Sequence, residues 1–354
     1  MNFFFYLGKY FKRTQNYQED NLNMSSDFLQ ISADSISVDD LSIVSPYRSV
    51  TTQQELTCAY VADSNSPEIF IGTKYWLFIY YASQELNLRP KAFYSIGSQI
   101  NGIDAYYTNN IIHVALATND GFVHLLQISR KKEMKCHKHT KVSVFYEPSQ
   151  KIILIGKNTI VSTNGGNKLA IVSDLDSSSK SWKSEIYEKN NIISSLKYHN
   201  NNLYLGYANG DIDILTSELE TLTTIHLNDK ILSIFPCSTN SNFLVVTEKS
   251  FIECSNENLS EFVNQIDFDE KISIAVPQSI QCEGGNCINR TFFQGANSKG
   301  FLFIINNNQK NKLENNHHEN KRIVDIELDQ PCTSATFIGD ALIYLSGHEI
   351  YAIL

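Results

Sequence analysis

From about residue 51 onward, apolar and polar residues alternate in short segments, and the 3.6-residue spacing of a helix is nearly absent. One unit recurs: an apolar strand, a polar turn, a second apolar strand that ends near a small residue, and a tight turn into a third strand. The two clearest copies contain the strands 103–107, 111–117 and 122–126, and the strands 193–198, 203–208 and 212–215. Their tight turns are Asn119-Asp120-Gly121 and Asn209-Gly210-Asp211.

Five fainter copies follow the same order along the chain. The first strands of all seven copies are predicted at 56–60, 103–107, 142–145, 193–198, 231–235, 272–275 and 333–337. The spacing is about 43 residues, within the range of a four-stranded propeller blade.

Ring closure follows from the two apolar faces of each unit, because each face can be buried only against a neighbouring unit. The last copy ends at Leu354 after its third strand. We therefore expect its outer strand to come from the N-terminal side, and the alternating segment 36–46 is the predicted donor. The prediction is an all-β toroid of seven sheets, although six or eight would also fit. The alternative is two stacked β-sandwiches.

The period, the strand order and the two Asn/Asp/Gly turns resemble the WD-repeat β-propeller family. No strand ends in Trp-Asp, and only His137–Val142 loosely resembles the Gly-His start of a repeat. The Asp-His-Ser hydrogen-bond network of well-formed repeats is therefore not expected. The resemblance implies a seven-bladed WD40-like propeller that acts as a non-catalytic interaction scaffold within a larger protein complex. The stretch 334–352 also resembles the end of a small propeller nucleoporin of the nuclear-pore outer ring.

The N-terminal region and one insert differ in composition from the repeats. Residues 1–35 are predicted to be a disordered tail, and 36–354 the propeller, interrupted by a polar, disordered insert at about 306–321. An aromatic cluster near the N-terminus is a candidate docking peptide for a groove on a partner protein. It consists of Phe3, Phe4, Phe5, Tyr6 and Leu7. The alternatives are that it packs on the chain's own surface or stays disordered.

Charge and cysteine content limit the partners and the compartment. The 354 residues include 29 basic and 38 acidic side chains, and the formal net charge of −9 disfavours direct nucleic-acid binding. Seven cysteines without a Cys-x-x-Cys pair indicate a reducing compartment, which predicts an intracellular protein in the nucleus, at the nuclear envelope, or in the cytoplasm. No apolar run is long enough to span a membrane.

One basic segment stands out against the negative net charge. Its cations are Arg130, Lys131, Lys132, Lys135, Lys138 and Lys141. Clustered cations attract phosphate groups, so the alternative function is a propeller that binds phosphoinositides or anionic membranes. Phosphoinositide-binding propellers resemble this chain in fold, but their Phe-Arg-Arg-Gly signature is absent. A solvated outer strand is the structural alternative. A third hypothesis is a substrate adaptor of a ubiquitin ligase.

The sequence offers little chemistry for catalysis or metal binding. Nucleophile elbows, phosphate-binding glycine loops and zinc-binding helices are all absent, so we expect no enzyme activity and no cofactor. Cys136-His137-Lys138-His139 holds three potential zinc ligands, but no second pair follows at zinc spacing. A group formed by Cys282, Cys287, His317 and His318 also matches no common motif. We expect no metal site.

Overall fold

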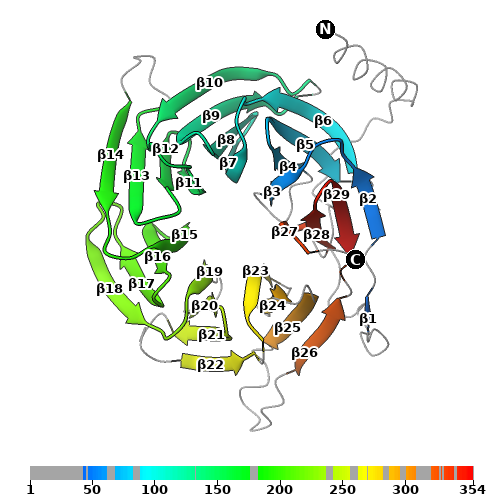
Figure 1. The fold of residues 1–354 in the computed structure, drawn as a ribbon, viewed down its shortest axis with the longest axis vertical. Helices are drawn as coiled ribbons and strands as arrows, with labels where there is room; N and C mark the ends of the chain where they lie inside the picture. The colour runs from blue at the N-terminus through cyan, green and yellow to red at the C-terminus, as the bar shows by residue number, and fades with distance from the viewer. Residues whose placement is uncertain are drawn as a thin grey trace. The chain divides into compact units, whose positions relative to one another are not determined.

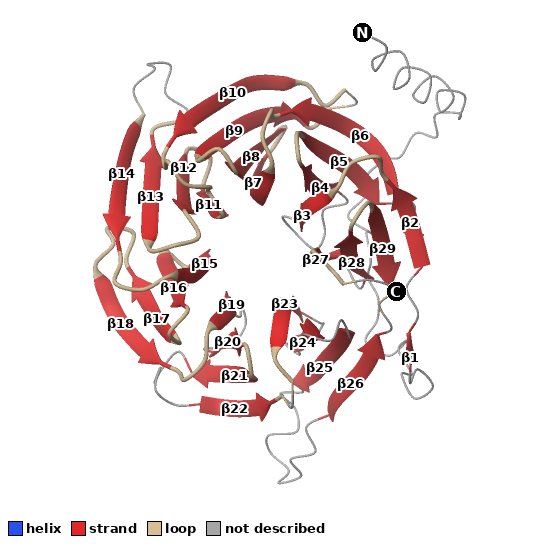
Figure 2. Cartoon of the chain, viewed as in Figure 1, coloured by secondary structure: helices blue, strands red, loops and turns tan. Residues whose placement is uncertain are grey.

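The computed structural model consists of short β-strands (Figure 2). It describes residues 43–44, 47–61, 68–82, 88–131, 133–175, 182–236, 242–255, 262–268, 270–281, 287–295, 300–307, 320–326, 328, 331–338 and 341–353. The chain divides into two units, Met1–Ile31 and Ser32–Leu354, and every described residue belongs to the second. Strand pairing groups the described strands into seven sheets, and the described part of the chain contains no helix.

The sheets follow one another along the chain. The first contains β3 (Leu56–Tyr60), β4 (Glu68–Thr73), β5 (Trp76–Ala82) and β6 (Leu88–Ser95). The second contains β7 (Ile100–Thr108), β8 (Ile111–Thr118), β9 (Phe122–Ser129) and β10 (Cys136–Ser143). The third contains β11 (Lys151–Ile155), β12 (Thr159–Thr163), β13 (Lys168–Ser173) and β14 (Lys183–Glu188). The fourth contains β15 (Ile193–His199), β16 (Asn202–Tyr207), β17 (Asp211–Leu215) and β18 (Thr221–His226).

The remaining sheets complete the series. The fifth contains β19 (Ile231–Pro236), β20 (Asn242–Thr247), β21 (Ser250–Ser255) and β22 (Phe262–Asp267). The sixth contains β23 (Ile272–Gln281), β24 (Cys287–Gly295), β25 (Gly300–Asn307), β26 (Asn320–Ile326) and β1 (Ile43–Val44). The seventh contains β27 (Ser334–Ile338), β28 (Ala341–Ser346), β29 (Glu349–Ile353) and β2 (Tyr47–Thr51).

The sheets are arranged as a closed ring (Figure 1). The innermost strand of each sheet packs against the innermost strand of the next, in the order β3, β7, β11, β15, β19, β23, β27 and again β3. The predicted all-β propeller is confirmed. The stacked-sandwich alternative is wrong, because seven separate sheets follow one another around a common centre.

The N-terminal side of the chain closes the ring, but with a different segment from the predicted one. β2 pairs antiparallel with β29, and Tyr47 lies opposite Ala352. The predicted donor 36–46 is wrong: its described part, β1, pairs in parallel with β26 of the sixth sheet. The physical reason is that the segment directly before β3 has to lie beside the seventh sheet. The Leu56 amide, at the start of β3, donates to the Gly347 carbonyl of that sheet (2.8 Å).

One predicted repeat boundary is also wrong. The segment 142–145 was expected to open the third repeat, but Val142 and Ser143 end β10, the outer strand of the second sheet. The innermost strand of the third sheet is β11 instead. Alternation of period two is the same in an inner and an outer strand, so the pattern could not distinguish them. Of the predicted disordered segments, residues 1–35 lie outside the described residues, as do 308–319 within the insert.

The core lies between neighbouring sheets. Along β8, Val114 and Leu116 pack into the cluster shared with the first sheet, whereas Ala115 and Ala117 pack into the cluster shared with the third. All four side chains are fully buried. Successive side chains of a strand point to opposite faces, so each sheet contributes to two layers of core. Burial of a large apolar side chain contributes about 1.5–3 kcal/mol, which favours every sheet-to-sheet contact in the ring.

A recurring polar contact joins the innermost strands across sheet boundaries. The register of β3, β7 and β15 each contains one extra residue near the start of the strand: Thr57, Asn101 and Ser194. Their side chains donate to backbone carbonyls at the start of the next sheet, Thr57 to Ile100 (2.6 Å), Asn101 to Ser149 (2.8 Å) and Ser194 to Ile231 (2.6 Å). These bulge contacts tie neighbouring sheets together.

One face of the ring is built from short turns and inter-sheet connections, and we call it the turn face. It contains the described turns between the second and third strands of the sheets and the described connections that lead to the next sheet. Backbone hydrogen bonds join the two kinds of segment, for example from Ile96 to Tyr75 (2.9 Å), from Leu227 to Gly210 (3.0 Å) and from Phe268 to Lys249 (2.7 Å). The turn face is therefore held by backbone contacts.

The two tight turns predicted from the sequence, at 119–121 and 209–211, both require a glycine. Gly121 and Gly210 have φ values of +78° and +94°. A Cβ atom at Gly121 would lie 2.2 Å from the Phe145 carbonyl oxygen, and one at Gly210 would lie 2.3 Å from the Leu227 carbonyl oxygen. Only glycine lets the connection approach the turn this closely.

We predict that Gly121→Ala lowers the free energy of unfolding by at least about 3 kcal/mol, because the methyl group would push the 144–145 backbone away from the turn. Gly97→Ala is the matched control, since Gly97 also has a positive φ (+85°) but has open space around it. It should cost about 1–2 kcal/mol, the left-handed strain alone. Urea unfolding followed by circular dichroism measures both, and equal losses would contradict the packing argument.

Candidate interaction face

The predicted basic segment lies between the end of β9 and the end of β10, and four of its described cations have partners within the protein. The Arg130 guanidinium forms two hydrogen bonds with the buried Glu68 carboxylate of β4, at 3.0 and 3.2 Å. It also lies over the Tyr107 ring, 4.9 Å from the centroid. Arg130 therefore joins the second sheet to the first.

The other described cations of the segment mostly have partners too. The Lys141 ammonium lies 3.0 Å from the Asp120 carboxylate and 4.1 Å from the centroid of the Phe122 ring. Lys135 pairs with Glu133 at 2.9 Å, and Lys138 donates to the Leu175 carbonyl at 3.0 Å. Lys132 lies outside the described residues. Lys131 is the one described cation of this segment for which we find no side-chain partner. Anion binding by the segment stays a prediction.

The histidines near this segment form a pair. His124 Nδ1 lies 2.8 Å from His139 Nε2, and the two rings stack with centroids 5.1 Å apart. Burial, followed by the charges of His139 and Lys141, lowers the pKa of His124 to about 3. Burial also lowers the pKa of His139. Both rings are therefore neutral at pH 7, and the described residues contain no group of three or more metal-ligating side chains.

The amino-acid sequence showed no sign of one partly buried carboxyl group on an innermost strand. Asp104 on β7 accepts hydrogen bonds from the Leu154 amide of β11 (2.6 Å) and from the Tyr60 hydroxyl of β3. Desolvation raises the pKa of Asp104, although these two bonds and the charge of Lys197 favour the ionised form. Asp104 thus ties three consecutive innermost strands together, which is a structural role. Its place in an alternating strand gave no signal of this contact.

The aromatic N-terminal cluster, Phe3 to Leu7, lies outside the described residues, so its docking role stays a prediction. Among the described residues, no helix is long and apolar enough to cross a bilayer.

Exposed apolar side chains are concentrated in one sector of the ring. The described residues contain seven large apolar side chains that are well exposed: Tyr75, Tyr106, Tyr146, Trp182, Ile186, Ile192 and Leu222. Four of them lie between Tyr146 and Ile192, in the third sheet and its two flanking connections. The third sheet and its two flanking connections therefore hold four of these seven exposed side chains.

Two of these side chains flank a single turn on the turn face. Tyr146 lies in the connection before β11, and its side chain is fully exposed (105%). Ile192 lies in the connection after β14 and is 54% exposed. The turn between them, Asn164–Asn167, joins β12 to β13. We call Tyr146, this turn and Ile192 the apolar sector.

Both connections contact this turn or the ends of the strands that it joins. Before β11, the Lys168 ammonium pairs with the Glu147 carboxylate at 2.9 Å, and the Gln150 amide donates to the Thr163 carbonyl at 2.8 Å. After β14, the Ile193 amide donates to the Gly166 carbonyl at 2.8 Å. The backbone next to Ile192 is thus bonded to this turn. The backbone next to Tyr146 is held by the second sheet instead, because the Phe145 amide donates to the Gly121 carbonyl at 3.0 Å.

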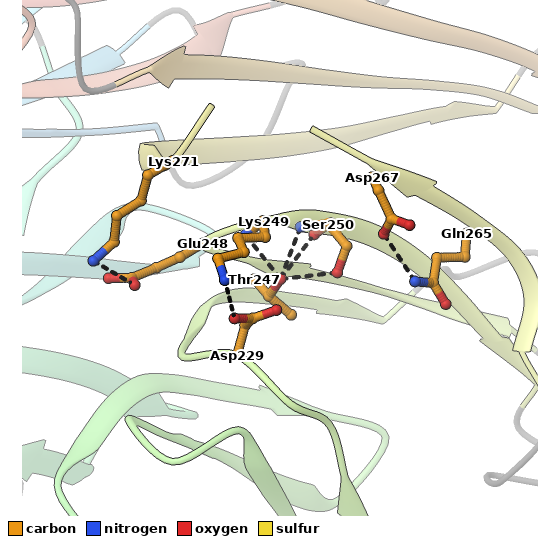
Figure 3. Close-up of polar contacts among 8 residues, drawn as sticks. All are labelled: Asp229, Thr247, Glu248, Lys249, Ser250, Gln265, Asp267 and Lys271. Carbon is orange, nitrogen blue, oxygen red and sulfur yellow. Dashed lines mark hydrogen bonds and ion pairs between the residues drawn. The ribbon is translucent and has the colours of Figure 1, made fainter. Parts of the chain in front are cut away.

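Farther around the turn face, the fifth sheet presents charged groups instead (Figure 3). Glu248, in the turn between β20 and β21, pairs with Lys271 at 2.7 Å and with Lys230 at 3.5 Å. The next residue, Lys249, pairs with Asp229 at 3.5 Å. The turn thereby contacts the connections on both sides of its sheet. The turn face has an apolar sector at the third sheet and an ion-paired sector at the fifth.

We predict that Arg130→Ala lowers the free energy of unfolding by about 2–4 kcal/mol, because it removes the guanidinium that forms two hydrogen bonds with the buried Glu68 carboxylate. Lys131→Ala is the control and should change stability by less than about 0.5 kcal/mol, since Lys131 is exposed. Thermal or urea unfolding of both variants tests this. Equal stabilities would mean that Arg130 does not hold the two sheets together.

Comparison with known proteins supports the fold alone. No known family matches the sequence, and no curated protein does. Among solved structures, the chain is similar to the crystal structure of Kluyvelomyces marxianus Hsv2, with a TM-score of 0.57 and 11% sequence identity. The similarity covers 84% of this chain and 90% of that one. The described residues therefore have the fold of a WD40-like β-propeller.

Proposed function

We propose that this chain is a non-catalytic interaction scaffold, a subunit of a larger protein assembly, and that the apolar sector of the turn face binds its partner. One observation carries the proposal: Tyr146 and Ile192 are exposed on either side of one turn. The connection of Ile192 is hydrogen bonded to that turn, and the connection of Tyr146 contacts the ends of the two strands that the turn joins. A WD40-like propeller fold is compatible with this role and with many others, so the surface has to supply the argument.

The physical case rests on rigidity and composition. Tyrosine is enriched among the residues that dominate binding energy at interfaces, and apolar contact area is most effective where the backbone is already ordered. Backbone hydrogen bonds order both sides of the apolar sector, to the β12–β13 turn on the Ile192 side and to the turn of the second sheet on the Tyr146 side. Binding there would therefore cost little conformational entropy.

The surroundings of the apolar sector suit a protein partner. Asn164, Gly165, Gly166 and Asn167 form a small polar surface between the two apolar side chains. The Lys168–Glu147 pair lies beside them and is partly exposed. Exposed apolar side chains next to polar and ion-paired groups are common at interfaces between proteins.

The anion-binding alternative gains no support from the described contacts. Arg130 and Lys141 are each paired with a carboxylate, and Lys138 is bonded to a carbonyl oxygen. An anionic ligand would have to displace these partners. We therefore retain the interaction scaffold as the proposed function.

We predict that the double variant Tyr146→Ala/Ile192→Ser loses at least one stoichiometric partner, with recovery falling about tenfold or more, since that fold-change corresponds to only 1.4 kcal/mol of binding energy. The measurement is quantitative mass spectrometry of the tagged chain purified from its own cells. Tyr106→Ala/Leu222→Ser is the matched control, because both of its residues are exposed and lie on other parts of the ring.

The control should retain the full set of partners, and both variants should keep the thermal stability of the parent chain. If the set recovered with the apolar-sector variant equals that of the parent, this surface does not bind the assembly and the proposal fails.

A finer assignment, to the outer ring of the nuclear pore, rests on the resemblance of residues 334–352 to the end of a small propeller nucleoporin. It predicts that the fluorescently tagged chain forms a rim at the nuclear envelope and co-purifies with other pore subunits. A diffuse cytoplasmic signal with no pore subunits bound would contradict this assignment and leave the scaffold proposal standing.

A further inference from the structure

Most outer strands of the ring contain a β-bulge. In five of the seven sheets the outer strand contains one extra residue relative to its neighbour, which interrupts the regular pairing. The extra residues are Lys91 in β6, His137 in β10, Leu222 in β18, Val263 in β22 and Ser49 in β2. Bulges of this kind protect an exposed sheet edge from pairing with another strand.

Two outer strands pair without interruption, β26 and β14. β26 is covered, because β1 pairs with it as a fifth strand. β14 is the outermost strand of the third sheet, and no described strand pairs with its free edge. The ring thus has one regular outer edge that holds an added strand and one that is open.

The open edge also presents apolar side chains. Every residue from Trp182 to Ile186 is exposed, with Trp182 at 42% and Ile186 at 54%. Ile186 lies opposite Ala170 and Ser184 opposite Val172, so these two side chains share one face of the sheet, and Trp182 continues the alternation. Lys183 and Glu185 lie on the other face. β14 therefore combines an apolar face, a charged face and a free backbone edge.

We propose that β14 is a self-association edge, which pairs antiparallel with β14 of a second copy of this chain in a register centred on Ser184. In this register, Trp182 of each copy lies opposite Ile186 of the other, and Lys183 lies opposite Glu185. Each of these pairs occurs twice because of the two-fold symmetry. Aromatic with β-branched pairs and opposite charges are both favourable cross-strand pairs.

The neighbouring symmetric registers are disfavoured by charge. A register centred on Glu185 places this carboxylate opposite itself. One centred on Ile186 places Lys183 opposite Lys189. Like charges directly opposite each other destabilise a strand pair, so the chain is self-complementary in the register centred on Ser184.

The position of β14 on the outer rim allows this pairing (Figure 1). A two-fold axis perpendicular to the third sheet would set two rings edge to edge and join their third sheets into one. The contact is confined to the rim, so a weak, concentration-dependent dimer is expected. This association is separate from binding at the apolar sector.

Charge reversal tests the proposal on the full chain by sedimentation velocity across a range of concentrations. The parent chain should show a concentration-dependent dimer. Lys183→Glu and Glu185→Lys should each raise the dissociation constant about tenfold or more, because each places like charges opposite each other. An equimolar mixture of the two single variants should restore a dimer, since the reversed charge in one copy then faces the unaltered charge in the other. The double variant Lys183→Glu/Glu185→Lys should dimerise alone.

Both positions are exposed, so the variants should unfold at the same temperature as the parent. A parent chain that stays monomeric at all concentrations would overturn the proposal, and β14 would then be available only to a different protein. Single variants that dimerise like the parent would overturn it too, because another surface would be responsible. Failure of the mixture to dimerise would show that the Ser184-centred register is wrong.

Discussion

The structure depends on one constraint: each sheet is apolar on both faces, and neither face can be buried within the sheet itself. β8 illustrates this, because Val114 and Ala115 are adjacent and fully buried, yet they contribute to cores on opposite sides. A linear stack of such sheets would leave two apolar faces in water. Closing the stack into a ring removes both, and the contact between β27 and β3 completes it.

Closure needs polar contacts as well as apolar ones, since burial alone does not fix the angle between neighbouring sheets. In this ring, polar side chains at bulges of the innermost strands help to fix how neighbouring sheets are oriented. Thr57, Asn101 and Ser194 each reach a carbonyl oxygen of the next sheet, and Asp104 bonds to the strands on both of its sides. These contacts hold neighbouring sheets together although the sequence lacks the hydrogen-bond triad of well-formed WD repeats.

Strand irregularity differs in its effect between the inside and the outside of the ring. Three inner bulges aim polar side chains at the next sheet. Outer bulges interrupt an edge that would otherwise pair with other strands. β14 has no outer bulge and has exposed apolar side chains, and the apolar sector of the turn face lies at the same sheet. The third sheet thus carries two surfaces suited to association, which are separate in position and in chemistry.

The amino-acid sequence by itself determined the all-β class, the ring and the positions of most strands, because period-two alternation and the tight glycine turns at Gly121 and Gly210 are local signals. It placed the closing strand too early and assigned 142–145 to the wrong sheet, since alternation does not distinguish inner from outer strands. Only the tertiary structure decided which charged side chains form ion pairs within the protein. Arg130 and Glu68 are 62 residues apart, and their pairing follows from the packing of two sheets that no local pattern encodes. The exposure of Tyr146, Ile192 and Ile186 likewise depends on what lies beside them, which the fold alone sets.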